Sequence, residues 1–362
     1  MLAYVDDILC ISLKAQATLS EMTDTFKFKN DLVAPPETYL GAQVAQKFHS
    51  LKNCEMWTMT STAYLKAAIQ TIETNENLQL PRKCHTPLSS GYRPETDVSE
   101  ELLPDRVTYF QEIIGILRWS IEIGRVDVLF EVSSLSAYQA SPRQGHLDQA
   151  LHILGYLKEH IKLTLYFDPS PITLPETIFR NNRDEFREQY RDAIEELPHN
   201  MPPPRGREVK ITAYCDSDHA TNKVTRRSQT GYLIFIQSSP ILWYSKRQNT
   251  VESSTFGAEF IAMKTCTEQI IALRIKLRMF GIPIDGPADV LGDNEAVVRN
   301  VRDFESTLKA KHNQIAYHRC REAVAAGIIH VGKVHTDWNL SDALTKALNG
   351  EKRGTLFDQW TY

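Results

Sequence analysis

Three stretches decide the fold of the C-terminal part of this chain: VKITAYCD (209–216), TGYLIFIQ (230–237) and PILWYSK (240–246). Each is a short run rich in β-branched and aromatic residues, and polar turns separate them, so we expect three consecutive strands. A long helical pattern follows at about 252–279. Beyond it the patterns indicate a strand, two helices, a strand and a short helix. The order β-β-β-α-β-α-α-β-α predicts a mixed five-stranded sheet with helices on its faces.

Upstream, helical periodicity dominates from about 50 to 170. Apolar residues recur there at i, i+3, i+4 and i+7, as in Phe110, Ile113, Ile114 and Leu117. This spacing predicts amphipathic helices that pack together. Residues 168–207 combine Pro-rich ends with a strongly charged centre, which indicates a linker that carries one solvated helix.

The N-terminal segment MLAYVDDILCISL (1–13) has two apolar runs separated by Asp6 and Asp7. This pattern predicts a β-hairpin with two carboxylates near its tip. The first run is shorter than a paired strand usually is, so we expect the chain to be truncated within an element.

Composition sets limits on the function. The chain has 362 residues, enough for two or three compact units. Its formal net charge of -4 means that nucleic-acid binding would need local basic patches. The six cysteines show neither a CxxC pair nor a zinc-type Cys/His spacing, which indicates reduced thiols. Since no apolar run approaches the roughly 18 residues of a membrane span, we expect an intracellular protein without a membrane partner.

Four acidic residues of the C-terminal part are candidates for a catalytic metal site: Asp216, Glu259, Asp293 and Asp342. Asp216 ends the first predicted strand, where a polar turn is the alternative explanation. Asp293 and Asp342 stand near the starts of predicted helices, where capping is the alternative. Acids at the ends of separate strands and adjoining helices can nevertheless converge into a hard-oxygen site suited to magnesium.

Glu259 lies within a helical stripe formed by Phe256, Phe260 and Met263. An inward-facing carboxylate costs several kcal/mol unless a metal or hydrogen-bond donors compensate it. A glutamate at the edge of the stripe that reaches solvent is the alternative. A converged set of four acids could bind two metal ions about 4 Å apart and hydrolyse a phosphodiester.

The C-terminal part resembles the ribonuclease H domain of copia-type long-terminal-repeat retrotransposon polyproteins. The motifs are YCDSDHA (214–220), RRSQTGY (226–232), LWYSKRQNTVESSTFGAEF (242–260), GDNEAVV (292–298), KHNQIAYHRCRE (311–322) and SDALTKAL (341–348). Two positions depart from the family pattern: His219 replaces a usual Trp, and Gly257 stands where Glu is common.

The resemblance implies hydrolysis of the RNA strand of an RNA/DNA hybrid. Asp216, Glu259, Asp293 and Asp342 would be catalytic and would bind two Mg²⁺ ions, with Mn²⁺ as an alternative. His335 would assist, although a surface histidine is the alternative reading.

The N-terminal part resembles the end of the same polyprotein's reverse transcriptase. Tyr4, Val5, Asp6 and Asp7 look like the polymerase hairpin, and Asp6 and Asp7 would supply two of its three metal-site acids. Further similar motifs are YLGAQV (39–44), YLKAAI (64–69), KCHTPL (83–88), IIGILRW (113–119), SSLSAY (133–138) and HLDQALHILGYLK (146–158). The rest of a polymerase would precede Met1, so we do not expect this chain alone to polymerise DNA.

The resemblance leaves three alternatives to an active ribonuclease H open: a catalytically silent fragment, a nucleic-acid-binding scaffold, and an incomplete gene model of a full reverse transcriptase. Expected partners besides the hybrid are the missing polymerase part and other retroelement proteins.

Together these patterns predict a multi-domain chain of α+β and α/β class. We expect a truncated palm (1–50), a helical thumb/connection-like region (51–167), a charged linker (168–207), a ribonuclease H-like domain (208–350) and a C-terminal tail (351–362).

Basic residues around the expected site are candidates for nucleic-acid contacts. They form three clusters: Arg226 with Arg227, Lys246 with Arg247, and Lys311 with His312. A solvated face is the alternative for each cluster, since any one of them is small.

Overall fold

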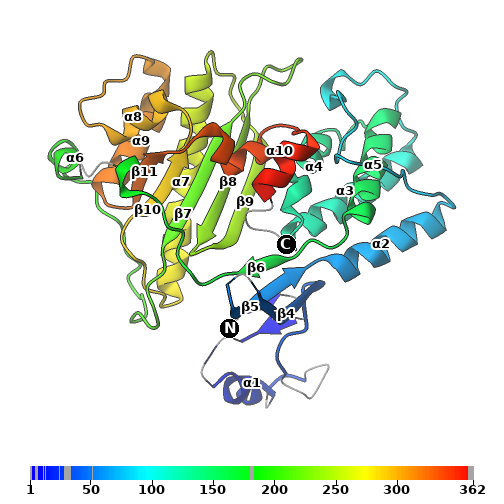
Figure 1. The fold of residues 1–362 in the computed structure, drawn as a ribbon, viewed down its shortest axis with the longest axis horizontal. Helices are drawn as coiled ribbons and strands as arrows, with labels where there is room; N and C mark the ends of the chain where they lie inside the picture. Colours follow the sequence, from blue (N-terminus) through cyan, green and yellow to red (C-terminus); the bar gives the residue numbers. More distant parts are fainter. Residues whose placement is uncertain are drawn as a thin grey trace.

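A computed structural model describes residues 2–4, 7–10, 12, 14–23, 25–27, 34–50, 52–179 and 183–357. The order predicted for the C-terminal part is confirmed (Figure 1). Its elements are β7 (Ile211–Ser217), β8 (Gln229–Ile236), β9 (Ser239–Arg247), α7 (Thr255–Met279), β10 (Ala288–Gly292), α8 (Glu295–Arg302), α9 (Gln314–Ala325), β11 (Ile329–Lys333), the short 3-10 helix η6 (Leu340–Leu344) and α10 (Gly350–Phe357).

The mixed five-stranded sheet is also confirmed, with the strand order β11-β10-β7-β8-β9. β8 is antiparallel to both β7 and β9, whereas β10 is parallel to β7 and to β11. Side chains alternate across β7: Ala213 joins a core that includes Phe260 of α7, and Tyr214 joins a core that includes Leu344 of η6. Burial on both faces explains why these strands read as nearly continuous apolar runs.

Among its described residues, the N-terminal part contains two small antiparallel sheets. The predicted hairpin is present as β1 (Leu2–Tyr4) paired with β2 (Asp7–Leu9), and α1 (Ala15–Thr23) follows. The second sheet has the order β3-β4-β5-β6. Its strands are β3 (Thr38–Tyr39), β4 (Ala42–His49), β5 (Cys54–Thr60) and β6 (Leu165–Phe167).

This second sheet corrects part of the expectation that residues 51–167 form a helical region. β5 and β6 lie inside that range, and β5 pairs along its whole length with β4. Along most of β5, CEMWTMT, more buried and less buried side chains alternate, as expected for a strand. The prediction of a helical region did not take this period of two into account.

Four helices follow β5: α2 (Thr62–Asn75), α3 (Pro104–Glu122), α4 (Leu129–Ser136) and α5 (Gln144–Glu159). The predicted stripe of α3 is confirmed, because Phe110, Ile113, Ile114 and Leu117 are fully buried in one core with α5. Within the described ranges, every helix is too short or too polar to span a membrane.

The segment 168–207 differs from the solvated linker predicted for it. Its helix α6 (Arg183–Gln189) buries Phe186 completely, and the guanidinium of Arg321 on α9 lies 4.6 Å from the Phe186 ring centre. Farther along, Glu195 pairs with Arg274 at 2.6 Å and with Arg278 at 2.5 Å on α7. The segment therefore packs onto the C-terminal domain.

The expected C-terminal tail also differs, as far as residue 357. It forms α10, which buries Arg353, Leu356 and Phe357. Figure 1 shows α10 between the five-stranded sheet and the helical region. The Arg353 guanidinium donates to Glu131 of α4 at 3.0 Å, so the helix connects both parts of the molecule.

Candidate metal centre

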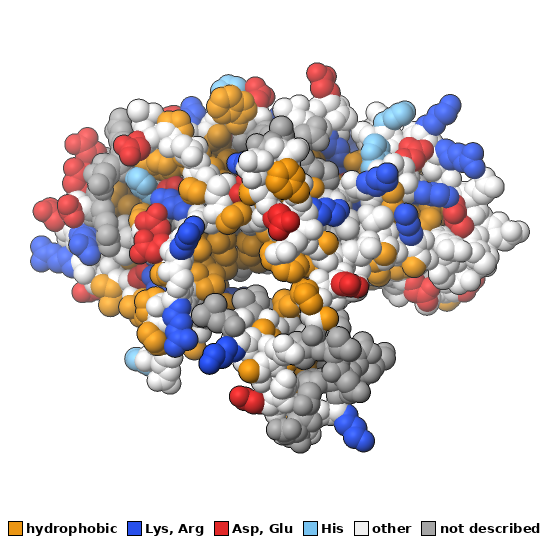
Figure 2. All heavy atoms as spheres, turned by 60° about the horizontal axis from the view of Figure 1, so that its bottom comes forward, with side chains coloured by type: hydrophobic (Ala, Val, Ile, Leu, Met, Phe, Trp, Pro, Cys, Tyr) orange, Lys and Arg blue, Asp and Glu red, His pale blue; other side chains and the backbone are white. Residues whose placement is uncertain are grey.

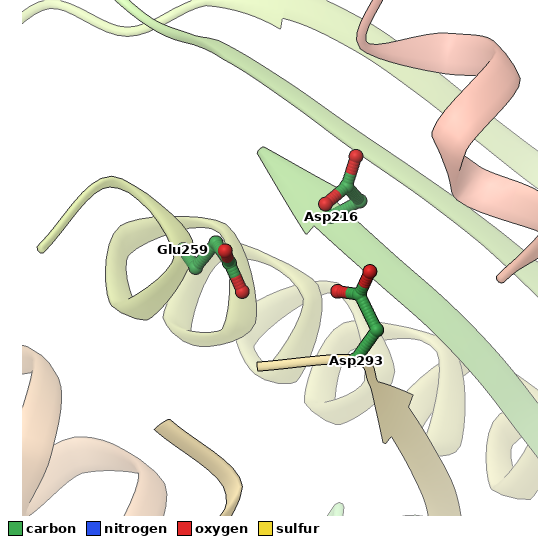
Figure 3. Close-up of side chains that lie close together, drawn as sticks. All are labelled: Asp216, Glu259 and Asp293. Atoms are coloured by element: carbon green, nitrogen blue, oxygen red, sulfur yellow. The ribbon is translucent and has the colours of Figure 1, made fainter. Parts of the chain in front are cut away.

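The structure brings three of the four predicted acids together at one end of the sheet. Asp216 lies near the end of β7, Glu259 in α7 and Asp293 directly after β10, and one carboxylate oxygen of each lies within 4.8 Å of the others (Figure 3). β7 and β10 are parallel neighbours, so their carboxyl ends meet at the same edge.

Local hydrogen bonds orient two of these carboxylates. Asn294 donates its side-chain amide to Glu259 Oε1 at 3.1 Å. The Thr345 hydroxyl donates to Asp216 Oδ2 at 2.6 Å. Asn294, rather than Asp293, is the N-cap of α8, which leaves the Asp293 carboxylate directed at the cluster.

The cluster is electrostatically unfavourable by itself. Burial, reinforced by the carboxylates of Asp293 and Asp342, raises the pKa of Asp216 to about 7. Burial, reinforced by Asp216 and Asp293, raises the pKa of Glu259 to about 8. Three hard oxygen donors that repel one another at this distance form a donor set that a divalent cation would stabilise.

Asp342 is near this cluster but has different partners. Its carboxylate is buried, with Lys346 Nζ 2.5 Å from Oδ1 and Lys352 Nζ 2.6 Å from Oδ2. The cap of its short helix η6 is Asn339, so the capping alternative does not describe Asp342. Sequence reasoning missed both lysines. The i, i+4 spacing of Asp342 and Lys346 was the available signal.

His335 occupies a surface position. Its Nδ1 accepts from the backbone N–H of Asp337 at 3.3 Å and lies 3.4 Å from an oxygen of the Asp337 carboxylate. The imidazole therefore caps a 3-10 turn, Thr336–Trp338. Of the expected polymerase acids, Asp6 lies outside the described residues, and Asp7 is described only as part of the β2 backbone.

The departure at Gly257 has a structural counterpart. A Cβ at this position would lie 2.5 Å from Glu252 Oε2 and 3.0 Å from Asn313 Nδ2. The Glu252 carboxylate therefore fills the space next to position 257. Glu252 Oε2 lies 3.4 Å from Nε2 of His312, so this candidate for nucleic-acid binding has a partner within the chain.

Three of the other basic candidates, Arg227, Lys246 and Arg247, line a cavity between the helical region and the sheet. The cavity has a volume of about 1070 Å³ and is lined on one side by Arg93, Arg118 and Tyr138, and on the other by Arg227, Lys246 and Arg247. It reaches Lys346, next to the carboxylates. Arg226 and Lys311 are exposed. Figure 2 shows Lys and Arg side chains interspersed with Asp and Glu on one face of the molecule.

Comparison with known proteins gives relatives along nearly the whole chain. The retrovirus-related Pol polyprotein from transposon TNT 1-94 of Nicotiana tabacum is 24% identical over 356 residues, 97% of this chain and 23% of that protein. The retrovirus-related Pol polyprotein from transposon RE2 of Arabidopsis thaliana is 24% identical over 352 residues, 96% of this chain and 21% of that protein. The chain thus spans about a fifth of the length of these curated relatives.

No protein-family model matches the chain. Among solved structures, RNase H1 from the halophilic archaeon Halobacterium salinarum is 17% identical to it, with a TM-score of 0.29. That match covers 38% of this chain and 94% of the other.

Proposed function

Because the chain belongs to the family of copia-type, retrovirus-related Pol polyproteins, we propose that residues 208–350 form a ribonuclease H that hydrolyses the RNA strand of RNA/DNA hybrids. The observation that supports this proposal most strongly is the convergence of Asp216, Glu259 and Asp293. These three acids come from different elements and share no structural task such as capping, which favours a chemical role.

The donor set fits magnesium, with manganese as an alternative. All three groups are carboxylates, the hard oxygen ligands that these ions prefer. We propose that Asp216, Glu259 and Asp293 hold one ion and that Asp342 takes part in holding a second. When bound, such ions activate water and stabilise the negative charge that develops on the phosphate.

The chain's own residues position this chemistry. Thr345 and Asn294 fix the orientations of the Asp216 and Glu259 carboxylates. Along the neighbouring cavity, Arg227, Lys246 and Arg247 would contact phosphates of the hybrid. Such contacts orient a nucleic acid without reading its sequence, which suits an enzyme that acts on hybrids of any sequence.

The remaining chain resembles the end of a reverse transcriptase. We propose that residues 1–50 form part of a palm and residues 51–167 a thumb/connection-like region. In this assignment the hairpin with Asp6 and Asp7 belongs to the polymerase site.

The test is cleavage of a hybrid labelled on either strand, by the full chain in Mg²⁺. We expect cuts in the RNA strand only. Asp216→Asn and Glu259→Gln should each lower the cleavage rate by more than about 100-fold, because each removes a ligand charge. Glu268→Gln is the matched control, since Glu268 is a partly exposed acid of the same helix, paired with Lys264.

Two results would contradict the proposal. Cleavage by both site variants at the wild-type rate would exclude the carboxylate cluster as the active site. Binding of the hybrid without cleavage, in Mg²⁺ and in Mn²⁺, would favour the nucleic-acid-binding scaffold instead.

A further inference from the structure

Asp342 differs from the three clustered acids in how its charge is compensated. Only 1% of its side chain is exposed, and an ionised carboxylate so deeply buried requires cationic partners. Two ammonium groups fill this role, one on each oxygen: Lys346 at 2.5 Å and Lys352 at 2.6 Å. Both oxygens that a metal ion could use are therefore engaged by side chains of the protein itself.

The Lys346 ammonium also acts on the carboxylate cluster. It lies close enough to favour the ionised forms of Asp216 and Glu259, and thus to oppose the increase that burial causes in their pKa values. The cluster and Asp342 in turn favour the charged form of Lys346. The Lys346 ammonium therefore supplies positive charge beside Asp342 and near the clustered acids, as a second divalent ion would.

We propose that Lys346 and Lys352 compete with a divalent ion for Asp342, so that the centre binds one ion tightly at Asp216, Glu259 and Asp293 and a second one weakly. This inference rests on the proposed function. Beyond that function, the two ions bind with different affinities, and Lys346 and Lys352 cause the difference. The second ion binds only when the lysine ammonium groups move away from the Asp342 oxygens.

The two side chains are suited to such movement. The Lys346 side chain is 42% exposed and the Lys352 side chain 32% exposed, so both reach solvent as well as the buried carboxylate. A lysine has a flexible four-carbon stem and a strongly hydrated ammonium group, so it can exchange a carboxylate for water by changing rotamer. The backbone nearby can stay in place, because Thr345 is anchored to Asp216 and the N–H of Lys352 to Asn349.

The experiment measures Mn²⁺ binding to the full chain without nucleic acid. Isothermal titration calorimetry gives the affinities, and the electron paramagnetic resonance signal of free Mn²⁺ gives the number of ions bound. For the wild type we expect one tight and one weaker site. Lys346→Gln should tighten the weaker site by about tenfold or more, because a neighbouring positive charge is removed. Lys352→Gln should act in the same direction. The tight site should change less in both variants.

Two further variants make the assignment specific. Asp342→Asn should abolish the weaker site and retain the tight one. Lys158→Gln is the matched control: Lys158 lies 2.8 Å from Glu73 in the helical region, is half exposed, and should leave both affinities unchanged.

The outcomes separate this inference from the proposed function. Two sites of equal affinity, or a weaker site that neither lysine variant tightens, would overturn the inference while hybrid cleavage could still occur. Absence of Mn²⁺ binding would overturn both. The expected binding pattern together with absent hybrid cleavage would leave the inference standing and contradict the ribonuclease H assignment.

Discussion

At the scale of single residues, the carboxylate cluster makes the stability of the metal-free chain depend on pH. In an unfolded chain Asp216 and Glu259 ionise near pH 4, whereas in the folded chain their pKa values are raised to about 7 and about 8. At pH values between the unfolded and the folded pKa values, the folded chain binds more protons than the unfolded chain. The free energy of unfolding should therefore fall, by on the order of a few kcal/mol, as the pH rises from about 5 to about 8.

Urea denaturation in a chelator, at several pH values across this range, measures the effect. Glu259→Gln should flatten the dependence because it removes one of the two titrating groups, and Glu268→Gln should leave it as in the wild type. Added Mg²⁺ should stabilise the chain more at about pH 8 than at about pH 5.5, since the ligands must lose protons to bind it. A slope in Glu259→Gln equal to that of the wild type would contradict this assignment.

What the sequence reveals about individual residues depends on where their partners lie. Asp216 and Asp293 were identifiable because they stand at or directly after the ends of apolar strands, and parallel strands carry such ends to one edge. The periodicity around Glu259 left its direction open, and the fold directs it to Asn294 and the cluster. Lys352 could not have been identified, because its contact with Asp342 requires α10 to pack beside η6.

At the scale of elements, α6 shows how the burial of a short helix can be missed and which contacts hold the helix in place. Phe186 is a single apolar residue in a charged segment, so no periodic pattern of apolar residues predicts its burial. Its ring contacts the Arg321 guanidinium and lies edge-on to Phe304, 5.6 Å between ring centres. We expect Phe186→Ala to destabilise the chain by about 3–5 kcal/mol, as fully buried aromatic residues generally do.

The measurement is urea denaturation, together with limited proteolysis of the segment 168–207. Phe186→Ala should increase cleavage in this segment. Ile194→Ala is the matched control, because Ile194 belongs to the same segment and is 73% exposed. If the two variants were equally stable and equally resistant to protease, α6 would not be held by Phe186.

At the scale of the whole molecule, the helical region and the C-terminal domain share a buried ionic contact. Arg353 of α10 pairs with Glu131 of α4 at 3.0 Å, and its guanidinium lies 5.4 Å from the ring centre of Tyr156 on α5. Burial raises the pKa of the Glu131 carboxyl, and Arg353 opposes that increase. The residue pattern predicted the order of elements in the C-terminal domain, but no periodicity could predict this pairing across 222 residues.

Removing one partner of this pair should destabilise the protein more than replacing both. Arg353→Ala leaves Glu131 buried without its cation, which should cost about 3–5 kcal/mol in a denaturant titration. In the double variant Arg353→Met, Glu131→Met, apolar side chains fill the space and much of that loss should be recovered. Arg319→Ala, which removes an exposed pair with Glu322, is the control and should change stability little. A double variant no more stable than Arg353→Ala would contradict this account of the pair.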